Sequence, residues 1–155
     1  MRTERVRTVA LTTALLLAPI TFAFAEVILN TVRYEHPIRR ISGKVTGGGS
    51  VMRVVWVDVY DNAQVRLDDS ESFVEQRKRQ KMVASIEPNE NGEFKVIHLP
   101  QGFYEVVVSN RGMGGYNVLS VLVNVSPNGA KDKLCMDLSL EGQGGHSTVT
   151  KCSAN

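Results

Sequence analysis

Apolar and polar residues alternate along most of the chain after residue 37, in short runs that turn residues separate. In the run 51–60, Val55, Val57 and Val59 alternate with polar or aromatic residues. A period of two is that of a strand with one buried face. Runs of this kind predict seven strands, at 38–45, 51–60, 82–86, 93–98, 103–109, 116–125 and 133–140.

Glycine and asparagine mark the turns between these strands. The segment 47–50 is Gly-Gly-Gly-Ser followed by a strand, and Asn91-Gly92 is typical of a tight hairpin. Seven short strands without a long apolar helix predict an all-β, antiparallel two-sheet sandwich over residues 38–140. Residues 26–37 are either an N-terminal extension or an edge strand interrupted by Pro37, and the Gly-, Ser- and Thr-rich residues 141–155 are expected to be a flexible tail.

The connection 61–81 is long for a compact sandwich. From residue 68 onward its acidic residues precede its basic ones, which suits the dipole of a helix, and Glu75 and Arg79 have helical i, i+4 spacing. We therefore expect a charged, partly helical insertion, with an ordered loop as the alternative.

The N-terminus has the layout of an export signal. Three arginines precede an apolar run at 9–24, which ends in Ala23-Phe24-Ala25. The pattern predicts a signal peptide over residues 1–25 and a periplasmic or secreted protein. The alternative, a membrane anchor, is disfavoured because a span needs about 20 apolar residues, so no membrane-spanning segment is expected after cleavage.

Charge and length limit the function classes. The chain has 18 basic and 16 acidic residues, and removing the three Arg and one Glu of residues 1–25 leaves 15 of each sign. A neutral mature chain gives no argument for nucleic-acid binding. About 130 residues are enough for one domain with its own core.

The segment 99–104 predicts a rigid corner. Pro100 fixes its own φ, Gly102 permits unusual backbone angles, and Tyr104 shares the inward face of the next strand with Val106. This spacing permits a tyrosine corner, in which the phenol bonds to the backbone a few residues upstream. Pro100, Gly102 and Tyr104 are therefore interpreted as structural.

Here the sequence resembles the carboxypeptidase regulatory-like domain. The shared marks are Gly43 and Val45 in "ISGKVTG", Asn91-Gly92-x-Phe94, and Leu99-Pro100-x-Gly102-x-Tyr104. The resemblance implies a seven-stranded immunoglobulin- or transthyretin-like sandwich, related to Cna-B repeats, and a non-catalytic module. We accordingly expect an exported protein-interaction or structural component of the cell envelope.

Motifs for catalysis do not stand out. His36, His98 and His146 lack ligand spacing, and the sequence contains no Gly-x-Ser-x-Gly, HExxH or P-loop motif. We therefore predict neither enzymatic activity nor a cofactor or metal. Trp56 and Tyr60 share one strand face, so the alternative function is a carbohydrate-binding module if that face points outward; core aromatics are the simpler interpretation.

Two further sets of residues carry predictions. Cys135 points away from the apolar face of its strand, so Cys152 is expected to fold back and form a disulfide with it; two free thiols are the alternative. Strands that reverse direction in turn would bring the connections 61–81, 99–102 and 126–133 to one end. That end would present a basic patch to an acidic envelope protein or polyanion, and its residues are Arg77, Lys78, Arg79, Lys81, Lys131 and Lys133.

Overall fold

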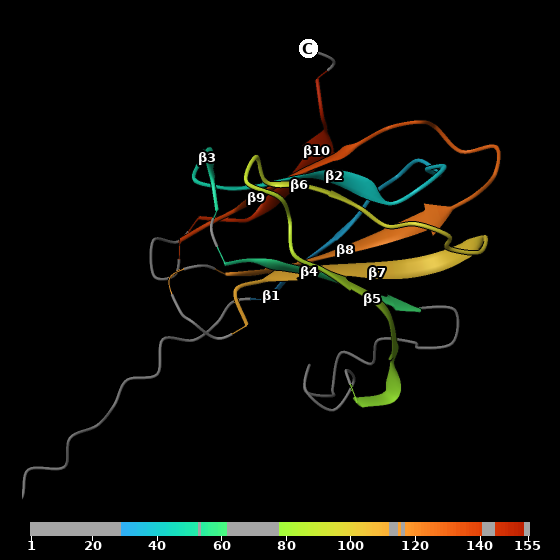
Figure 1. Ribbon diagram of the computed structural model, residues 1–155, viewed down its shortest axis with the longest axis horizontal. Coiled ribbons are helices and arrows are strands. Elements are labelled where there is room, and N and C mark those ends of the chain that lie inside the picture. Colours follow the sequence, from blue (N-terminus) through green and yellow to red (C-terminus); the bar gives the residue numbers. More distant parts are fainter. Residues whose placement is uncertain are drawn as a thin grey trace, which may run out of the picture.

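The computed structural model describes residues 29–52, 54–61, 78–111, 115, 117–140 and 145–153, which form two packed β-sheets (Figure 1). The first sheet has the order β1 (Leu29–Arg33), β8 (Val118–Val125), β7 (Gly102–Ser109), β4 (Trp56–Asp61) and β5 (Lys81–Ile86). The second has the order β10 (Thr148–Lys151), β9 (Leu134–Leu138), β2 (Ser42–Gly47) and β3 (Ser50–Val51), with β6 (Glu93–Lys95) also paired to β2.

The predicted all-β class is confirmed, but the strand number and the purely antiparallel arrangement are wrong. The described residues form ten strands, and both sheets are mixed. β1 runs parallel to β8, and β2 runs parallel to β9. Both parallel pairs join strands far apart in the sequence, and local alternation identifies a strand without identifying its partner.

The helical part of the predicted insertion is not seen. Residues 62–77 lie outside the described residues, and at the described end only Lys78 and Arg79 have helical conformation. β4 and β5 pair antiparallel as far as Asp61 and Lys81. The insertion is therefore the connection of a β-hairpin, and the strand pairing, not a helix, determines where its two ends meet.

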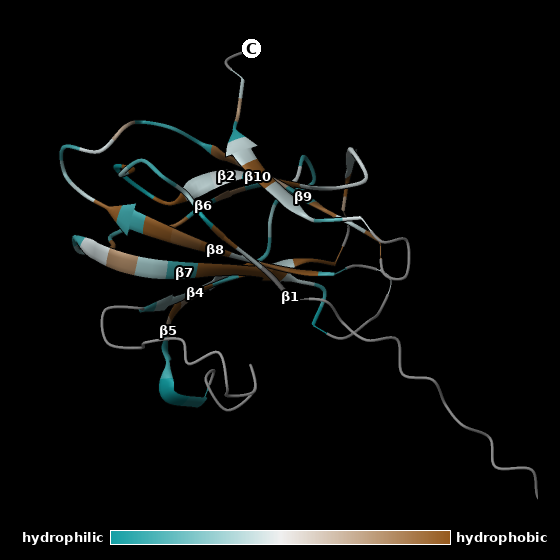
Figure 2. Ribbon diagram, turned by 180° about the vertical axis from the view of Figure 1, so that it is seen from behind, coloured by the Kyte–Doolittle hydropathy of each residue, from teal (hydrophilic) through white to brown (hydrophobic). Residues whose placement is uncertain are grey.

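The core lies between the two sheets. The buried residues include Val45, Val57, Val106, Leu134 and Met136. On β2 and β9 the buried residues alternate with more exposed neighbours, whereas β4 and β7 are buried along most of their length. Figure 2 shows hydrophobic residues concentrated along the central strands β4, β7 and β8. The period of two seen in the sequence is therefore the period of burial on which the sandwich depends.

Ile38 joins the two sheets before β2 begins. Its side chain is fully buried, and its backbone forms parallel bridges to both Val125 and Ala130. Its amide donates to the Asn124 carbonyl, while its own carbonyl accepts from Ser126. This connection fixes how the chain passes from β1 in the first sheet to β2 in the second.

Candidate anion-binding groove

The outer face of the second sheet collects charged side chains from three strands. β6 buries Phe94 in the core, so its neighbours Glu93 and Lys95 point outward. The β2–β6 register places Lys95 opposite Ser42 and Glu93 opposite Lys44. β9 lies on the other side of β2, and the chain that leads into it carries Lys131 and Lys133.

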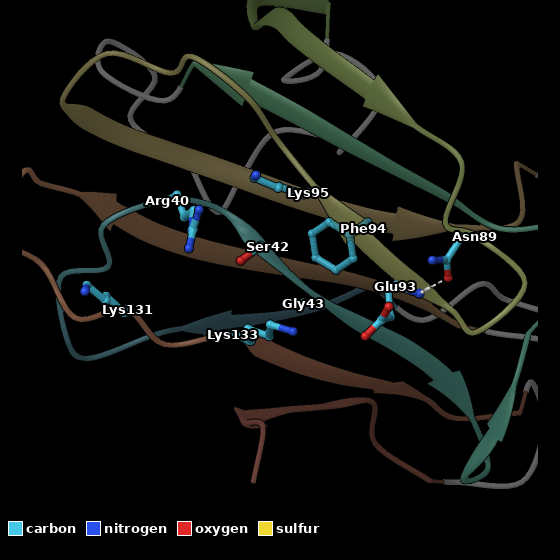
Figure 3. A pocket seen from close by; sticks show the side chains of 9 residues that line it. All are labelled: Arg40, Ser42, Gly43, Asn89, Glu93, Phe94, Lys95, Lys131 and Lys133. Carbon is cyan, nitrogen blue, oxygen red and sulfur yellow. Dashed lines mark hydrogen bonds between the residues drawn. The ribbon is translucent and has the colours of Figure 1, made fainter. Parts of the chain in front are cut away.

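These residues surround a hollow of about 350 Å³ (Figure 3). Arg40, Lys131, Lys133 and Lys95 lie around Ser42, whereas Glu93 lies toward the opposite end. A second hollow, of about 680 Å³, shares Glu93, Lys131 and Lys133 with the first. The two hollows therefore form one continuous depression along β6, β2 and β9.

We call this depression the basic groove. Its lining includes six cations and two carboxylates, so positive charge exceeds negative charge by four. The cations are Arg40, Lys44, Lys95, Lys131, Lys133 and Lys151, and the carboxylates are Glu93 and Asp132. A concave surface with this local excess attracts anions although residues 26–155 carry equal numbers of basic and acidic side chains.

One of the two carboxylates is engaged within the protein. The Lys151 ammonium lies 2.7 Å from the Asp132 carboxylate, and the Tyr34 hydroxyl donates to the other carboxylate oxygen at 3.3 Å. The hydrogen bond from Lys151 lowers the pKa of Asp132, and the same contact raises the pKa of Lys151. Both groups are therefore charged at neutral pH, and Asp132 neutralises Lys151 more than the remaining cations.

The turn before β6 fixes one end of the groove. The Asn89 side-chain oxygen accepts hydrogen bonds from the amides of Asn91 and Glu93, at 3.0 and 2.9 Å. The Gly92 backbone has φ 76°, which is the left-handed conformation expected of Asn-Gly in a hairpin turn. This turn holds Glu93 and the following Lys95 in register with β2.

The structure divides the predicted basic patch between two places. Lys131 and Lys133 line the basic groove, whereas Lys81 begins β5 at an edge of the first sheet. Lys78 and Arg79 are exposed beside β5, and Arg77 lies outside the described residues. Both groups were expected at one end of the sandwich, but Lys81 belongs to the first sheet, whereas Lys133 directly precedes β9 of the second.

Four groove cations were missed in the sequence: Arg40, Lys44, Lys95 and Lys151. The alternation around Phe94 identifies Lys95 as outward, and that around Val45 does the same for Lys44. Their convergence with Lys131 depends on the order β6–β2–β9, which no local pattern specifies.

The predicted disulfide is confirmed. Cys135 on β9 is bonded to Cys152, and the Cys152 amide also donates to the Lys133 carbonyl at 2.9 Å. Residues 148–151 of the expected flexible tail form β10, which pairs antiparallel with β9. The disulfide and β10 together place Lys151 beside Asp132 at the end of the groove.

The corner at residues 100–104 is built around one hydrogen bond. The Tyr104 hydroxyl donates to the Pro100 carbonyl at 2.9 Å, and burial raises the pKa of Tyr104. The ring of Tyr104 is 5% exposed and packs into the core. Gly102 does not have a positive φ, so the unusual backbone conformation expected at Gly102 is not found, and the corner depends on Pro100 and on the Tyr104 hydrogen bond.

Trp56 and Tyr60 do not form an open aromatic platform. Tyr60 is buried, and the Arg111 guanidinium lies 4.7 Å from the centre of the Trp56 ring. Arg111 also bonds to the Asp58 carboxylate at 2.8 Å and to the Ser85 hydroxyl at 2.6 Å. One face of the indole is therefore occupied by the protein's own cation.

Two other kinds of feature, a metal site and a membrane-spanning helix, are not found among the described residues. No group of three or more His, Cys, Asp or Glu side chains converges as metal ligands there. No helix in that part of the chain is both long and apolar enough to cross a membrane. In comparisons with known proteins, no family model, curated protein or solved structure matches the chain.

Proposed function

We propose that this protein is an exported, non-catalytic binding module of the cell envelope that takes an anionic partner in the basic groove. The observation that carries the proposal is the gathering of six cations against two carboxylates in one concave surface. Opposite charges that meet across a contact accelerate encounter and select partners. A groove open to solvent suits a polymer or an acidic protein surface better than a small enclosed substrate.

The disulfide and the N-terminal sequence support a periplasmic or secreted location for this module. A disulfide is typical of oxidising compartments outside the cytosol, and residues 1–25 have the sequence of an export signal. The fold assignment proposed is a carboxypeptidase regulatory-like domain. Its support is the two-sheet sandwich together with the Asn91-Gly92 turn and the Tyr104 corner.

The test is binding of the purified exported protein to inorganic polyphosphate at low and moderate salt. In the groove variant, Arg40, Lys95, Lys131 and Lys133 are all changed to Ser. We expect at least a tenfold loss of affinity at low salt, equivalent to about 1.4 kcal/mol, and a weaker dependence on salt. Circular dichroism of each variant verifies that the sandwich is retained.

A matched control removes four positive charges elsewhere. In that variant, Arg77, Lys78, Arg79 and Lys81 are changed to Ser, which gives the same change in net charge. The proposal requires the groove variant to lose far more affinity than this control. Equal losses would show that net charge alone determines binding, and a larger loss in the control would move the binding surface to the insertion.

A further inference from the structure

A third hollow, of about 380 Å³, lies against β7, β8 and the chain at the end of β1, in the first sheet. Phe103 on β7 is 59% exposed, because its neighbour Tyr104 takes the inward position. Asn124 on β8 lies directly opposite Phe103 in the strand register, and Leu122 is two residues away on the same face. The hollow therefore combines a large aromatic surface with a side-chain amide.

Charged groups complete this hollow. Arg33 at the end of β1 lies opposite Leu122 in the parallel register, and Glu35 follows two residues later. Both line the hollow, and both are exposed. The lining thus offers guanidinium and amide donors together with carboxylate and amide acceptors around one apolar ring.

A sugar ring matches this combination of groups. A pyranose has one face rich in C–H groups that packs on an aromatic ring, and hydroxyls at its rim that need donors and acceptors. An apolar peptide side chain would cover Phe103 but would use none of the donors and acceptors of Arg33, Glu35 and Asn124. A ligand with one apolar face and several hydroxyls, such as a sugar, can use both the aromatic ring and the polar groups of this hollow.

One hydrogen bond connects this hollow to the basic groove. Tyr34 lines the hollow, and its hydroxyl donates at 3.3 Å to Asp132, which lines the groove. Asp132 in turn pairs with Lys151. Phe103 points away from the second sheet, so the hollow and the groove open on opposite faces of the sandwich. The Tyr34–Asp132 contact lies at the edge between them, where the chain after β1 approaches the segment that leads into β9.

We propose that the anionic partner is an acidic polysaccharide that passes round this edge, with one sugar ring stacked on Phe103 and the anionic groups of other sugars of the same polymer in the basic groove. This inference rests on the proposed function, because it names the chemical class of the groove's partner. Phe103 stacks on the sugar ring, and the groove cations pair with the anionic groups of the polymer. A polyanion without sugars uses the groove alone.

The experiment compares three kinds of probe on the exported protein. Polygalacturonate and heparin are acidic polysaccharides, polyphosphate is a polyanion without sugars, and dextran is a neutral polysaccharide. We expect Phe103→Ala to weaken binding of an acidic polysaccharide about tenfold and to leave polyphosphate binding unchanged. Phe103→Tyr keeps the ring and restores binding, and Ile97→Ala, which truncates another exposed apolar residue, has no effect.

The outcomes separate the two proposals. Binding of neither acidic polysaccharide, equal losses in Phe103→Ala and Ile97→Ala, or dextran binding as tight as that of polygalacturonate each overturns the sugar-site inference. If polyphosphate binding still depends on the groove variant in those cases, the anion-binding function stands. Unchanged polyphosphate binding in the groove variant overturns the anion-binding function, whatever Phe103 does.

Discussion

Gly43 of β2 faces Leu134 of β9 so closely that a β-carbon on Gly43 would lie 1.9 Å from the Leu134 carbonyl oxygen. The two residues are partners in the parallel β2–β9 register, and Gly43 also lies opposite Phe94 of β6. Because Gly43 has no side chain, β2 can lie close to both β6 and β9 at this position. The basic groove lies over this junction, so its shape depends on the contact.

Gly43→Ala is expected to destabilise the protein by about 3 kcal/mol, because the new methyl group would meet the backbone of Leu134 and β9 would have to shift. The measurement is the midpoint of urea unfolding. Gly102→Ala is the control, since its new methyl group would have 3.6 Å to its nearest neighbour, the Tyr104 ring. If the two variants unfold at the same midpoint, the Gly43 contact does not limit the packing of β2 and β9.

Tyr104→Phe removes the hydroxyl that bonds to the Pro100 carbonyl and keeps the buried ring. We expect a loss of about 1 kcal/mol in the free energy of unfolding, which is typical of one hydrogen bond whose acceptor can recover water. The loss should appear in urea unfolding without a change in polyphosphate binding. A variant as stable as the wild type would show that the hydrogen bond from Tyr104 to Pro100 does not stabilise the corner.

The alternation of residues such as Val45 and Met136 with more exposed neighbours predicted where most strands lie, because a strand that is buried on one face has apolar residues at every second position. It did not predict that Leu29–Arg33 pairs with Val118–Val125 in parallel, since the pairing of distant strands produces no pattern in the sequence of either strand. Thr148–Lys151 also escaped prediction as a strand. Its order comes from pairing with β9 and from the Cys135–Cys152 bond, not from apolar alternation.

The candidate site was predicted in part for the same reason. Lys131 and Lys133 are two of the six residues of the predicted basic patch, and both line the groove. Lys95 and Lys44 come from strands that were correctly placed, but only the β6–β2–β9 order brings them to Lys131. The position of Lys151 depends in addition on β10.

Removal of the disulfide by changing both Cys135 and Cys152 to Ser is expected to cost about 3 kcal/mol of unfolding free energy, given a separation of 17 residues. The amides of β10 should then exchange with solvent faster than those of β9, because β10 is an edge strand. Reducing agent should shift the wild type toward the variant and leave the variant unchanged. Equal stability of the wild type in reducing and oxidising buffer would contradict the prediction.

Arg111→Ala is expected to expose Trp56, which is the single tryptophan of the chain. Acrylamide should then quench the fluorescence more strongly, and the protein should lose about 1 kcal/mol, because the nearly buried Asp58 loses its cation. Arg111→Lys keeps the charge but loses the planar group, so an intermediate quenching constant is expected. Identical quenching in all three proteins would exclude the stacked arrangement in solution.

The pair formed by Asp132 and Lys151 predicts how stability depends on pH. The hydrogen bond from Lys151 lowers the pKa of Asp132, with a smaller contribution from the Tyr34 hydroxyl. A lowered pKa means that the carboxylate stabilises the folded state fully above its ordinary pKa of about 4, and that this contribution is lost as pH falls through the lowered value. The raised pKa of Lys151 has the opposite sign, so its contribution is lost only as pH rises through that raised value, above the ordinary 10.5.

Asp132→Asn should therefore lower the free energy of unfolding by a constant amount between about pH 5 and pH 9, and the difference from the wild type should shrink on acidification below about pH 4. The measurement is urea unfolding across this range, with Lys151→Gln and the double variant completing a cycle that isolates the pair. The same Asp132→Asn variant should bind polyphosphate more tightly, because it removes one of the two carboxylates that line the basic groove. A difference from the wild type that stays constant down to strongly acidic pH would contradict the lowered pKa, since a protonated Asp132 keeps no ionic advantage over Asn.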